Sequence, residues 1–141
     1  APYTMFIGSG ALWGETILFS MCILEEMQWK RTRYISSADF FHGTLELVEP
    51  GVPVFLFMGE DENRKLDERA RAFLTRGVTG DTDINIIDTA EFAIPGLDDE
   101  FRVIVSPWIL TVLVTDRLAR YYETVTKHNL NYRRYYHQFD Y

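Results

Sequence analysis

The chain has 141 residues, of which 47% are hydrophobic and 25% charged, so it is long enough for one globular domain with a substantial core. Its net charge of -7 disfavours nucleic acid as a partner, and the lack of a signal peptide or of an apolar run of roughly 18 residues disfavours a membrane. Cys22 is the single cysteine, which excludes an internal disulfide and a CxxC metal site and fits a reducing, cytoplasmic location.

The first half of the chain alternates β-prone and helical patterns. Residues 3–7 are apolar and β-prone, and Gly8-Ser9-Gly10 ends this predicted strand. Residues 11 to about 31 are apolar on most sides of a helix, which is typical of a buried helix. The next predicted elements are a short strand, a helical turn and a strand covered on both faces, at 34–36, 44–48 and 54–58.

The second half continues the alternation. Asp61 is the predicted N-cap of a helix that runs to Arg76, with Gly77 as its stop. Residues 84–88 form a predicted strand, and residues 103–105, being β-branched, predict another. Ser106 then caps a final helix that has Pro107 at its first position and ends near residue 127.

This order predicts an α/β fold, specifically a three-layer α/β/α sandwich with a mainly parallel, flavodoxin-like sheet. We expect residues 1–130 to form the domain and residues 131–141 to form a carboxyl-terminal tail rich in aromatic residues. That tail either frays in solution or lies as an extended strap over a neighbouring surface.

Two loops at the carboxyl edge of the predicted sheet are candidates for ligand binding. Gly8-Ser9-Gly10 precedes a helix, so its backbone and the following amides suit an anion, although a plain tight turn explains the same pattern. The third glycine of a dinucleotide fingerprint is missing, which argues against a nicotinamide cofactor. The other loop is Asp39-Phe40-Phe41-His42-Gly43, whose imidazole joins Glu26 as a possible proton-transfer pair.

The second loop also carries a family resemblance. Residues 38–46 (ADFFHGTLE) and the following residues 50–56 (PGVPVFL) resemble the Glu-Phe-x-His-Gly-Pro signature of sugar isomerase (SIS) domains. Residues 25–29 (EEMQW) and the end of the chain from Arg133-Arg134-Tyr135-Tyr136 to Tyr141 are similar to one branch, the fructosamine-6-phosphate deglycases. Those enzymes carry two tandem SIS domains, and the chain resembles the second.

The resemblance implies a sugar-phosphate substrate and no cofactor, with Glu26 and His42 as the catalytic residues. No pair of histidines has the spacing of metal ligands, so we expect no metal. The resemblance also implies that Asp39 and Arg134 contact the substrate, and we expect the anion-binding loop of Gly8, Ser9 and Gly10 to do so as well. The family glutamate is replaced by Asp39, and the family proline by Thr44, which leaves the range of substrates open. Family active sites form between domains and subunits, so we expect a homodimer or larger assembly with a composite site, and little activity from this domain alone.

Other interpretations stay open at this point. From composition alone, Glu26 is a solvated glutamate that pairs with Lys30, and His42 is a structural histidine. Within the SIS family, the alternatives are an aldose-ketose isomerase, the isomerase half of a glucosamine-6-phosphate synthase, or a phosphosugar sensor without catalysis.

Overall fold

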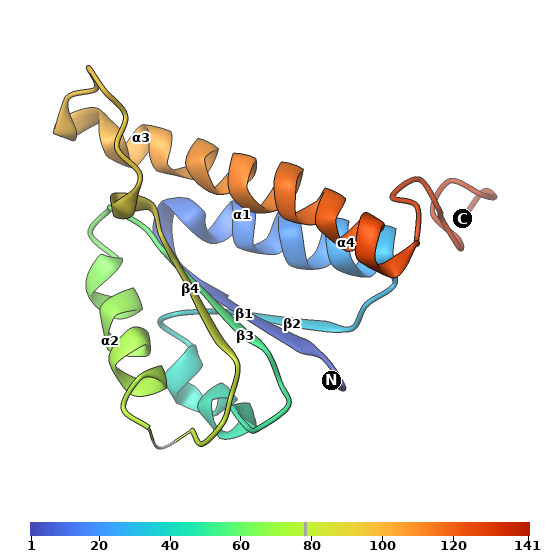
Figure 1. Ribbon diagram of the computed structural model, residues 1–141, viewed down its shortest axis with the longest axis horizontal. Coiled ribbons are helices and arrows are strands. Elements are labelled where there is room, and N and C mark those ends of the chain that lie inside the picture. Colours follow the sequence, from blue (N-terminus) through green and yellow to red (C-terminus); the bar gives the residue numbers. More distant parts are fainter. Residues whose placement is uncertain (78) are drawn as a thin grey trace.

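A parallel sheet of four strands forms the centre of the computed structural model, which describes residues 1–77 and 79–141 (Figure 1). The strand order is β2-β1-β3-β4, and every neighbouring pair is parallel. The strands are β1 (Thr4–Gly8), β2 (Thr32–Ser36), β3 (Val54–Met58) and β4 (Ile84–Asp88). Because parallel strands need crossover connections, the helices between them come to lie on the faces of the sheet.

Two long helices cover one face, the upper one in Figure 1. Each is continuous but changes its winding along its length, with a π-helical stretch in both. The first comprises η1 (Gly10–Leu12), α1 (Trp13–Ile17) and η2 (Leu18–Met27), and the second α3 (Asp99–Leu110), η6 (Thr111–Leu118) and α4 (Ala119–Thr126).

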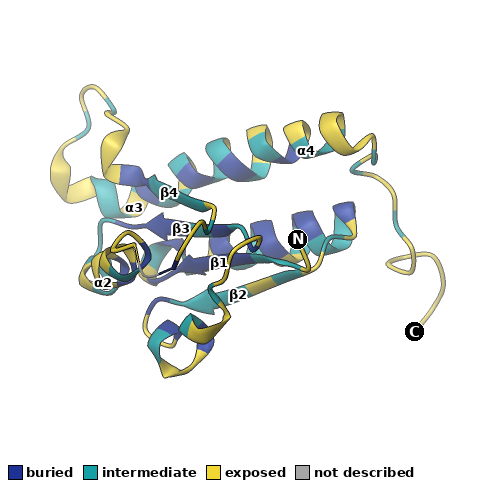
Figure 2. Ribbon diagram, turned by 60° about the horizontal axis from the view of Figure 1, so that its bottom comes forward, coloured by how far each residue is buried: buried dark blue, intermediate teal, exposed yellow. Residues whose placement is uncertain are grey.

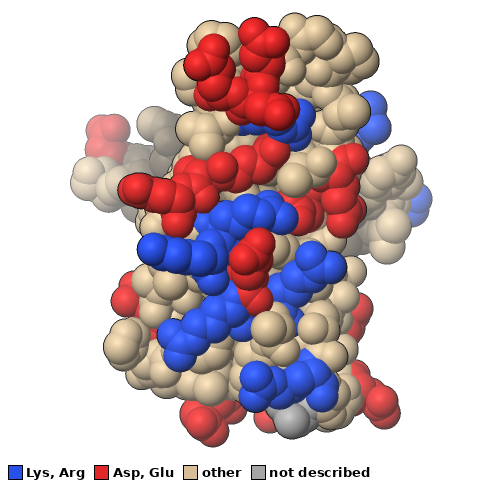
Figure 3. Space-filling model, turned by 90° about the vertical axis from the view of Figure 1, so that its left-hand side faces the viewer, with Lys and Arg blue, Asp and Glu red and all other residues tan. Residues whose placement is uncertain are grey.

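The opposite face is covered by shorter elements. They are α2 (Arg64–Leu74) and the single turns η3 (Phe40–His42) and η4 (Thr44–Leu47), while η5 (Thr89–Glu91) follows β4. Helices on both faces of a parallel sheet confirm the predicted α/β/α sandwich. Figure 3 views the molecule from the side on which α2 lies, and Lys and Arg side chains gather across the middle of that face.

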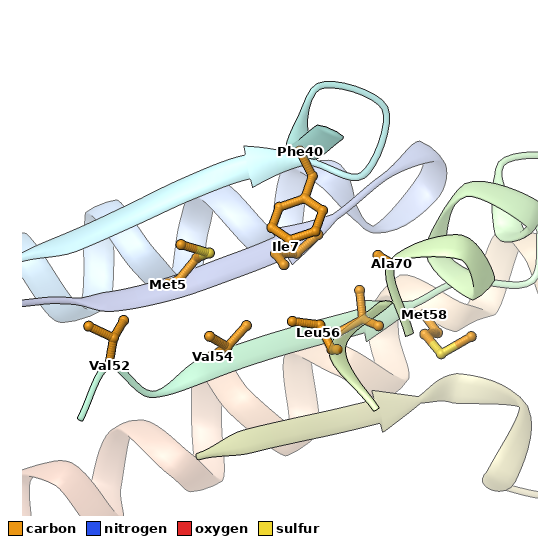
Figure 4. Close-up of a cluster of buried hydrophobic side chains, with 9 residues drawn as sticks. Met5, Ile7, Phe40, Val52, Val54, Leu56, Met58 and Ala70 are labelled. Atoms are coloured by element: carbon orange, nitrogen blue, oxygen red, sulfur yellow. The ribbon is translucent and has the colours of Figure 1, made fainter. Parts of the chain in front are cut away.

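The core consists of two apolar layers, one on each face of the sheet (Figure 2). Strand β3 contributes side chains to both layers. Val54, Leu56 and Met58 belong to the layer under α2 and η3, whereas Phe57 faces the long helices. Figure 4 shows the first layer, in which Phe40 inserts above Ile7. This alternation explains the unbroken apolar run of β3, because both of its faces are covered.

The prediction of a strand at Val103–Val105 is wrong. These residues lie inside α3, which begins at Asp99, so Ser106 is not an N-cap and Pro107 lies in the helix interior. The proline lacks an N–H, and the hydroxyl of Ser106 donates to the carbonyl of Val103 at 3.2 Å, which satisfies the acceptor that the proline leaves free.

The predicted start of the helix at Asp61 is also wrong. The residue at the N-cap of α2 is Asn63, and Asp61 belongs to the turn before it, where its carboxylate accepts the N–H of Asn63 at 2.7 Å. At the other end, Gly77 has a φ of +82°, in keeping with its predicted role as the stop signal.

One side of α3 is apolar and exposed. Phe101, Ile104 and Trp108 follow each other at helical spacing, with exposed fractions of 46%, 68% and 70%. Within the described residues, none of the helices is long and apolar enough to cross a membrane.

Candidate functional site

Glu26 lies in the last turn of η2, at the amino-terminal edge of the sheet, because η2 runs antiparallel to β1. Three residues after Glu26, the helix is closed by Trp29, whose φ of +53° is in the left-handed region. The N–H groups of Trp29 and Lys30 donate to the carbonyls of Glu25 and Leu24, at 3.1 and 2.9 Å. The carboxylate of the neighbouring Glu25 is bound to the hydroxyl of Thr32 at 2.5 Å and is thereby tied to β2.

A groove of about 700 Å³ opens beside Glu26. One wall comes from the end of η2 and the start of β2, and the other from the carboxyl-terminal tail. Its charged and aromatic lining includes Glu26, Trp29, Lys30, Arg31, Arg133 and Arg134. The lysine and the three arginines outnumber the two carboxylates of the lining, Glu25 and Glu26, so this groove is attractive to an anion although the protein as a whole is acidic.

The Glu26 carboxylate forms an ion pair with Arg133, in which Nε lies 2.9 Å from Oε1. The two side chains are 26% and 18% exposed, so the pair is partly shielded from water. This arrangement differs from the simple expectation of a solvated glutamate that pairs with Lys30. Arg134, for which we predicted substrate binding, lies over the Trp29 ring at 4.3 Å from its centre.

His42 lies elsewhere, at the end of η3 on the opposite face of the sheet. Its backbone N–H donates to the carbonyl of Asp39 at 2.9 Å, and its side chain is exposed. Two residues earlier, Phe40 is fully buried and fixes the loop in the core. Asp39 makes a local turn, because its carboxylate accepts the hydroxyl of Ser36 at 2.8 Å.

One copy of the chain therefore does not bring the two predicted catalytic residues together. Glu26 belongs to the helix layer above the sheet and to the edge where the strands begin, whereas His42 follows the carboxyl end of β2 and lies in the layer below. The catalytic roles of both residues, and the contact of Asp39 with substrate, stay predictions.

The hydrogen-bond donors of the Gly8-Ser9-Gly10 loop and of the helix start after it already bind carboxylates of the protein itself. Asp61 accepts the N–H of Ala11 at 2.5 Å, at the helix start where we expected a substrate anion. Gly10 has a φ of +53°, and a Cβ there would lie 2.2 Å from Oδ2 of Asp61, so the glycine serves close packing. Substrate binding by Gly8, Ser9 and Gly10 stays a prediction.

Sequence reasoning missed Asp67, which is only 1% exposed and joins the ends of three strands. Its Oδ1 accepts the hydroxyls of Ser9 and Ser37 at 2.6 and 2.5 Å, and its Oδ2 accepts the N–H of Gly59 at 3.2 Å. Burial raises the pKa of Asp67, and these hydrogen bonds oppose that rise. In the sequence, Asp67 looks like one more charged residue of a surface helix, so no pattern marks it.

In the part of the chain that the structure describes, no three His, Cys, Asp or Glu side chains are grouped to hold an ion. The expectation that the protein needs no metal or cofactor stays a prediction.

The fold matches a solved structure of a candidate phosphosugar isomerase from Bacillus subtilis, with a TM-score of 0.88 and 29% identity over 99% of this chain and 42% of that one. No family model matches the chain. The four-stranded parallel sheet, its order and this match show the fold of SIS-type phosphosugar isomerase domains.

The curated relatives indicate which enzymes with this fold the chain resembles. The chain is 33% identical over 136 residues to the fructosamine deglycase FrlB of Bacillus subtilis (strain 168), covering 94% of this chain and 39% of that protein. It is 35% identical over 116 residues to the fructoselysine 6-phosphate deglycase of Escherichia coli (strain K12), covering 80% of this chain and 31% of that protein. The chain is thus similar to one part of the fructosamine and fructoselysine deglycases, and it spans less than two-fifths of the length of these two relatives.

Proposed function

We propose that the chain is the second SIS domain of a cytoplasmic deglycase that splits fructosamine 6-phosphates into glucose 6-phosphate and a free amine. The observation that carries this proposal is the position of Glu26, a carboxylate that pairs with Arg133 in a groove also lined by Lys30, Arg31 and Arg134. A sugar phosphate is anionic and needs such cations, and its conversion needs a group that moves a proton from carbon. The names of the relatives point to the same chemistry.

The proposed reaction consists of two proton transfers and a hydrolysis. The open-chain ketosamine loses a proton from C1 to form an enaminol, and C2 then gains a proton to give an aldimine. Water adds to the C=N bond, and the amine leaves, so one water is consumed for each glucose 6-phosphate formed. We assign the proton transfer at carbon to Glu26, and ring opening or protonation of the departing amine to His42.

The separation of Glu26 and His42 within one chain adds a requirement for assembly. If both act on one substrate, Glu26 of one copy works with His42 of another, and the active unit is a homodimer or a larger assembly. The remainder of the protein, which corresponds to the part of the relatives that this chain does not span, would complete the phosphate site.

The first test uses the full-length protein with fructosamine 6-phosphates of different amines and measures glucose 6-phosphate. We expect product from the wild type, and a loss of about a hundredfold or more in kcat for Glu26→Gln and for His42→Ala. Glu68→Gln is the matched control, because it makes the same chemical change on α2, where Glu68 is 59% exposed. A wild type that binds the substrate without forming glucose 6-phosphate would refute the proposal.

Mixed assemblies test the composite site. When the Glu26→Gln and His42→Ala proteins are unfolded, mixed and refolded together, a hybrid dimer contains one site with both native residues. We expect activity to return in the mixture, although each variant alone is inactive. No recovery, with hybrid dimers shown to be present by mass, would mean that the two residues do not complement each other across subunits.

A further inference from the structure

The carboxyl-terminal tail is anchored where the helix α4 ends. Lys127 has a φ of +58°, which turns the chain back toward the end of η2. There the side chain of Gln28, 5% exposed, holds both sides of the turn. Its Nε2 donates to the carbonyl of His128 at 2.7 Å, and its Oε1 accepts the hydroxyl of Thr126 at 2.8 Å. We refer to residues 128–136, which comprise the turn after α4 and the first part of the tail, as the strap.

The strap contacts Trp29 at two points. The His128 ring packs edge-on against the indole, with 4.4 Å between ring centres, and the Arg134 guanidinium lies over it at 4.3 Å. Trp29 is itself in the left-handed conformation, which is costly for a bulky residue and persists only where its surroundings fix it. The end of η2 and the strap therefore hold each other in place.

Arg133 is fixed by the strap's own backbone. Its Nη1 donates to the carbonyls of Leu130 and Tyr132, at 2.7 and 2.9 Å, while Nε faces Glu26. The Glu26 carboxylate has this ion pair and, among the described residues, accepts no hydrogen bond. Because the guanidinium is held at its far end, it restricts the rotamers of Glu26 and leaves Oε2 for a ligand in the groove.

We propose that the strap is a positioning device in which Arg133 holds the Glu26 carboxylate, aimed into the groove, for proton transfer. This inference rests on the proposed function of Glu26. It assigns different tasks to the two neighbouring arginines. Arg133 uses its donors on the strap and on Glu26, whereas Arg134 stacks on Trp29 and, within the described part of the chain, donates no hydrogen bond, so its N–H groups are available to a substrate anion.

The two tasks predict different kinetic effects in the full-length protein. Removing a positioning residue lowers kcat, and we expect Arg133→Gln to cost about tenfold or more in kcat with KM changed less than about twofold. Removing an anion-binding residue weakens binding, so Arg134→Gln is expected to raise KM with a smaller effect on kcat. Arg133→Lys, which keeps the charge but loses the fork of donors, is expected to recover part of the lost kcat.

Two further variants make the assignment specific. In the double variant Glu26→Gln/Arg133→Gln, we expect no fall in kcat beyond that of Glu26→Gln, because Arg133 acts through Glu26. Arg120→Gln is the matched control: its ion pair with Asp116, at 3.2 Å with side chains 73% and 62% exposed, joins α4 to η6 outside the groove. This control is expected to leave kcat and KM unchanged.

Hydrogen exchange of residues 128–136, measured by mass spectrometry on the full-length protein, tests the strap without any turnover. We expect faster exchange in Arg133→Gln than in the wild type and in Arg120→Gln. Unchanged exchange of these residues in Arg133→Gln would refute the claim that Arg133 holds the strap in place, whatever the activity of the variant. In an active wild type, an Arg133→Gln protein with unchanged kcat, or with a raised KM alone, would overturn the positioning role. A wild type without product would refute the proposed function, and the exchange result would still decide whether Arg133 holds the strap.

Discussion

Asp67 allows a quantitative prediction about stability. In Asp67→Asn, the amide oxygen can still accept the hydroxyls of Ser9 and Ser37, but the amide N–H₂ replaces the oxygen that accepts the N–H of Gly59. A buried donor then faces a buried donor, which costs about 1–3 kcal/mol. The two serine bonds also lose their charged acceptor, at about 1 kcal/mol each, while removal of a buried charge offsets part of the loss. We expect a net loss of about 2 kcal/mol at pH 7.

The effect depends on pH in a defined direction. Burial raises the pKa of Asp67 above its value in the unfolded chain, so folding is favoured when this carboxyl is protonated. Its contribution to stability is complete below the unfolded pKa, near 4, and is lost as the pH rises through the folded value. Asp67→Asn lacks this titration. The wild type should therefore gain stability relative to the variant as the pH falls from 7 toward the unfolded pKa, near 4.

Urea unfolding of the 141-residue chain and its variant, followed by circular dichroism at several pH values, measures both quantities. The slope of free energy against urea should be unchanged, since the same surface is exposed on unfolding. A variant as stable as the wild type at pH 7 would refute the hydrogen-bond reasoning. A stability difference that stays constant from pH 7 down to pH 4 would refute the reasoning about the raised pKa.

Two other substitutions probe the same edge of the sheet. Gly8→Ala places a Cβ 2.3 Å from Oγ1 of Thr16, which is fully buried, and we expect a loss of about 1–3 kcal/mol in urea unfolding. Its control is Gly14→Ala, whose Cβ meets nothing within 4 Å inside α1, with an expected gain of about 0.5–1 kcal/mol; equal effects of the two would contradict the steric argument. The Arg64 guanidinium holds the pKa of Asp88 below its usual value, so this carboxylate contributes stability above the unfolded pKa and loses it as the pH falls through the folded value. Asp88→Asn should therefore be less stable than the wild type at pH 7 in a thermal melt, and the difference should shrink below about pH 4.

Most elements of the fold follow from patterns in the sequence. Strand β3 was predicted at its observed bounds because a short apolar run after Pro53 has few alternatives. The start of α3 was missed because Val103, Ile104 and Val105 favour a strand in isolation, while their packing in a long helix depends on tertiary contacts. The acidic run from Asp98 is a helix-start signal that was available in the sequence.

The candidate site could be predicted only in part. Glu26 and Arg134 were selected through the resemblance, and they do line one groove. The ion pair of Glu26 with Arg133 joins residues far apart in the chain, and no local spacing encodes such a pair. The distance between Glu26 and His42 in space was equally hidden, since a β-strand between them carries the chain across the sheet.

The exposed apolar side of α3 has a practical consequence for work with this chain. Phe101, Ile104 and Trp108 offer a hydrophobic dye such as ANS a surface on the fully folded molecule. ANS fluorescence is commonly taken as a sign of a loosened, molten state. For this chain a bright dye signal would coexist with native packing, so near-ultraviolet circular dichroism, which reports fixed aromatic side chains, is the measurement that distinguishes a native preparation from a molten one.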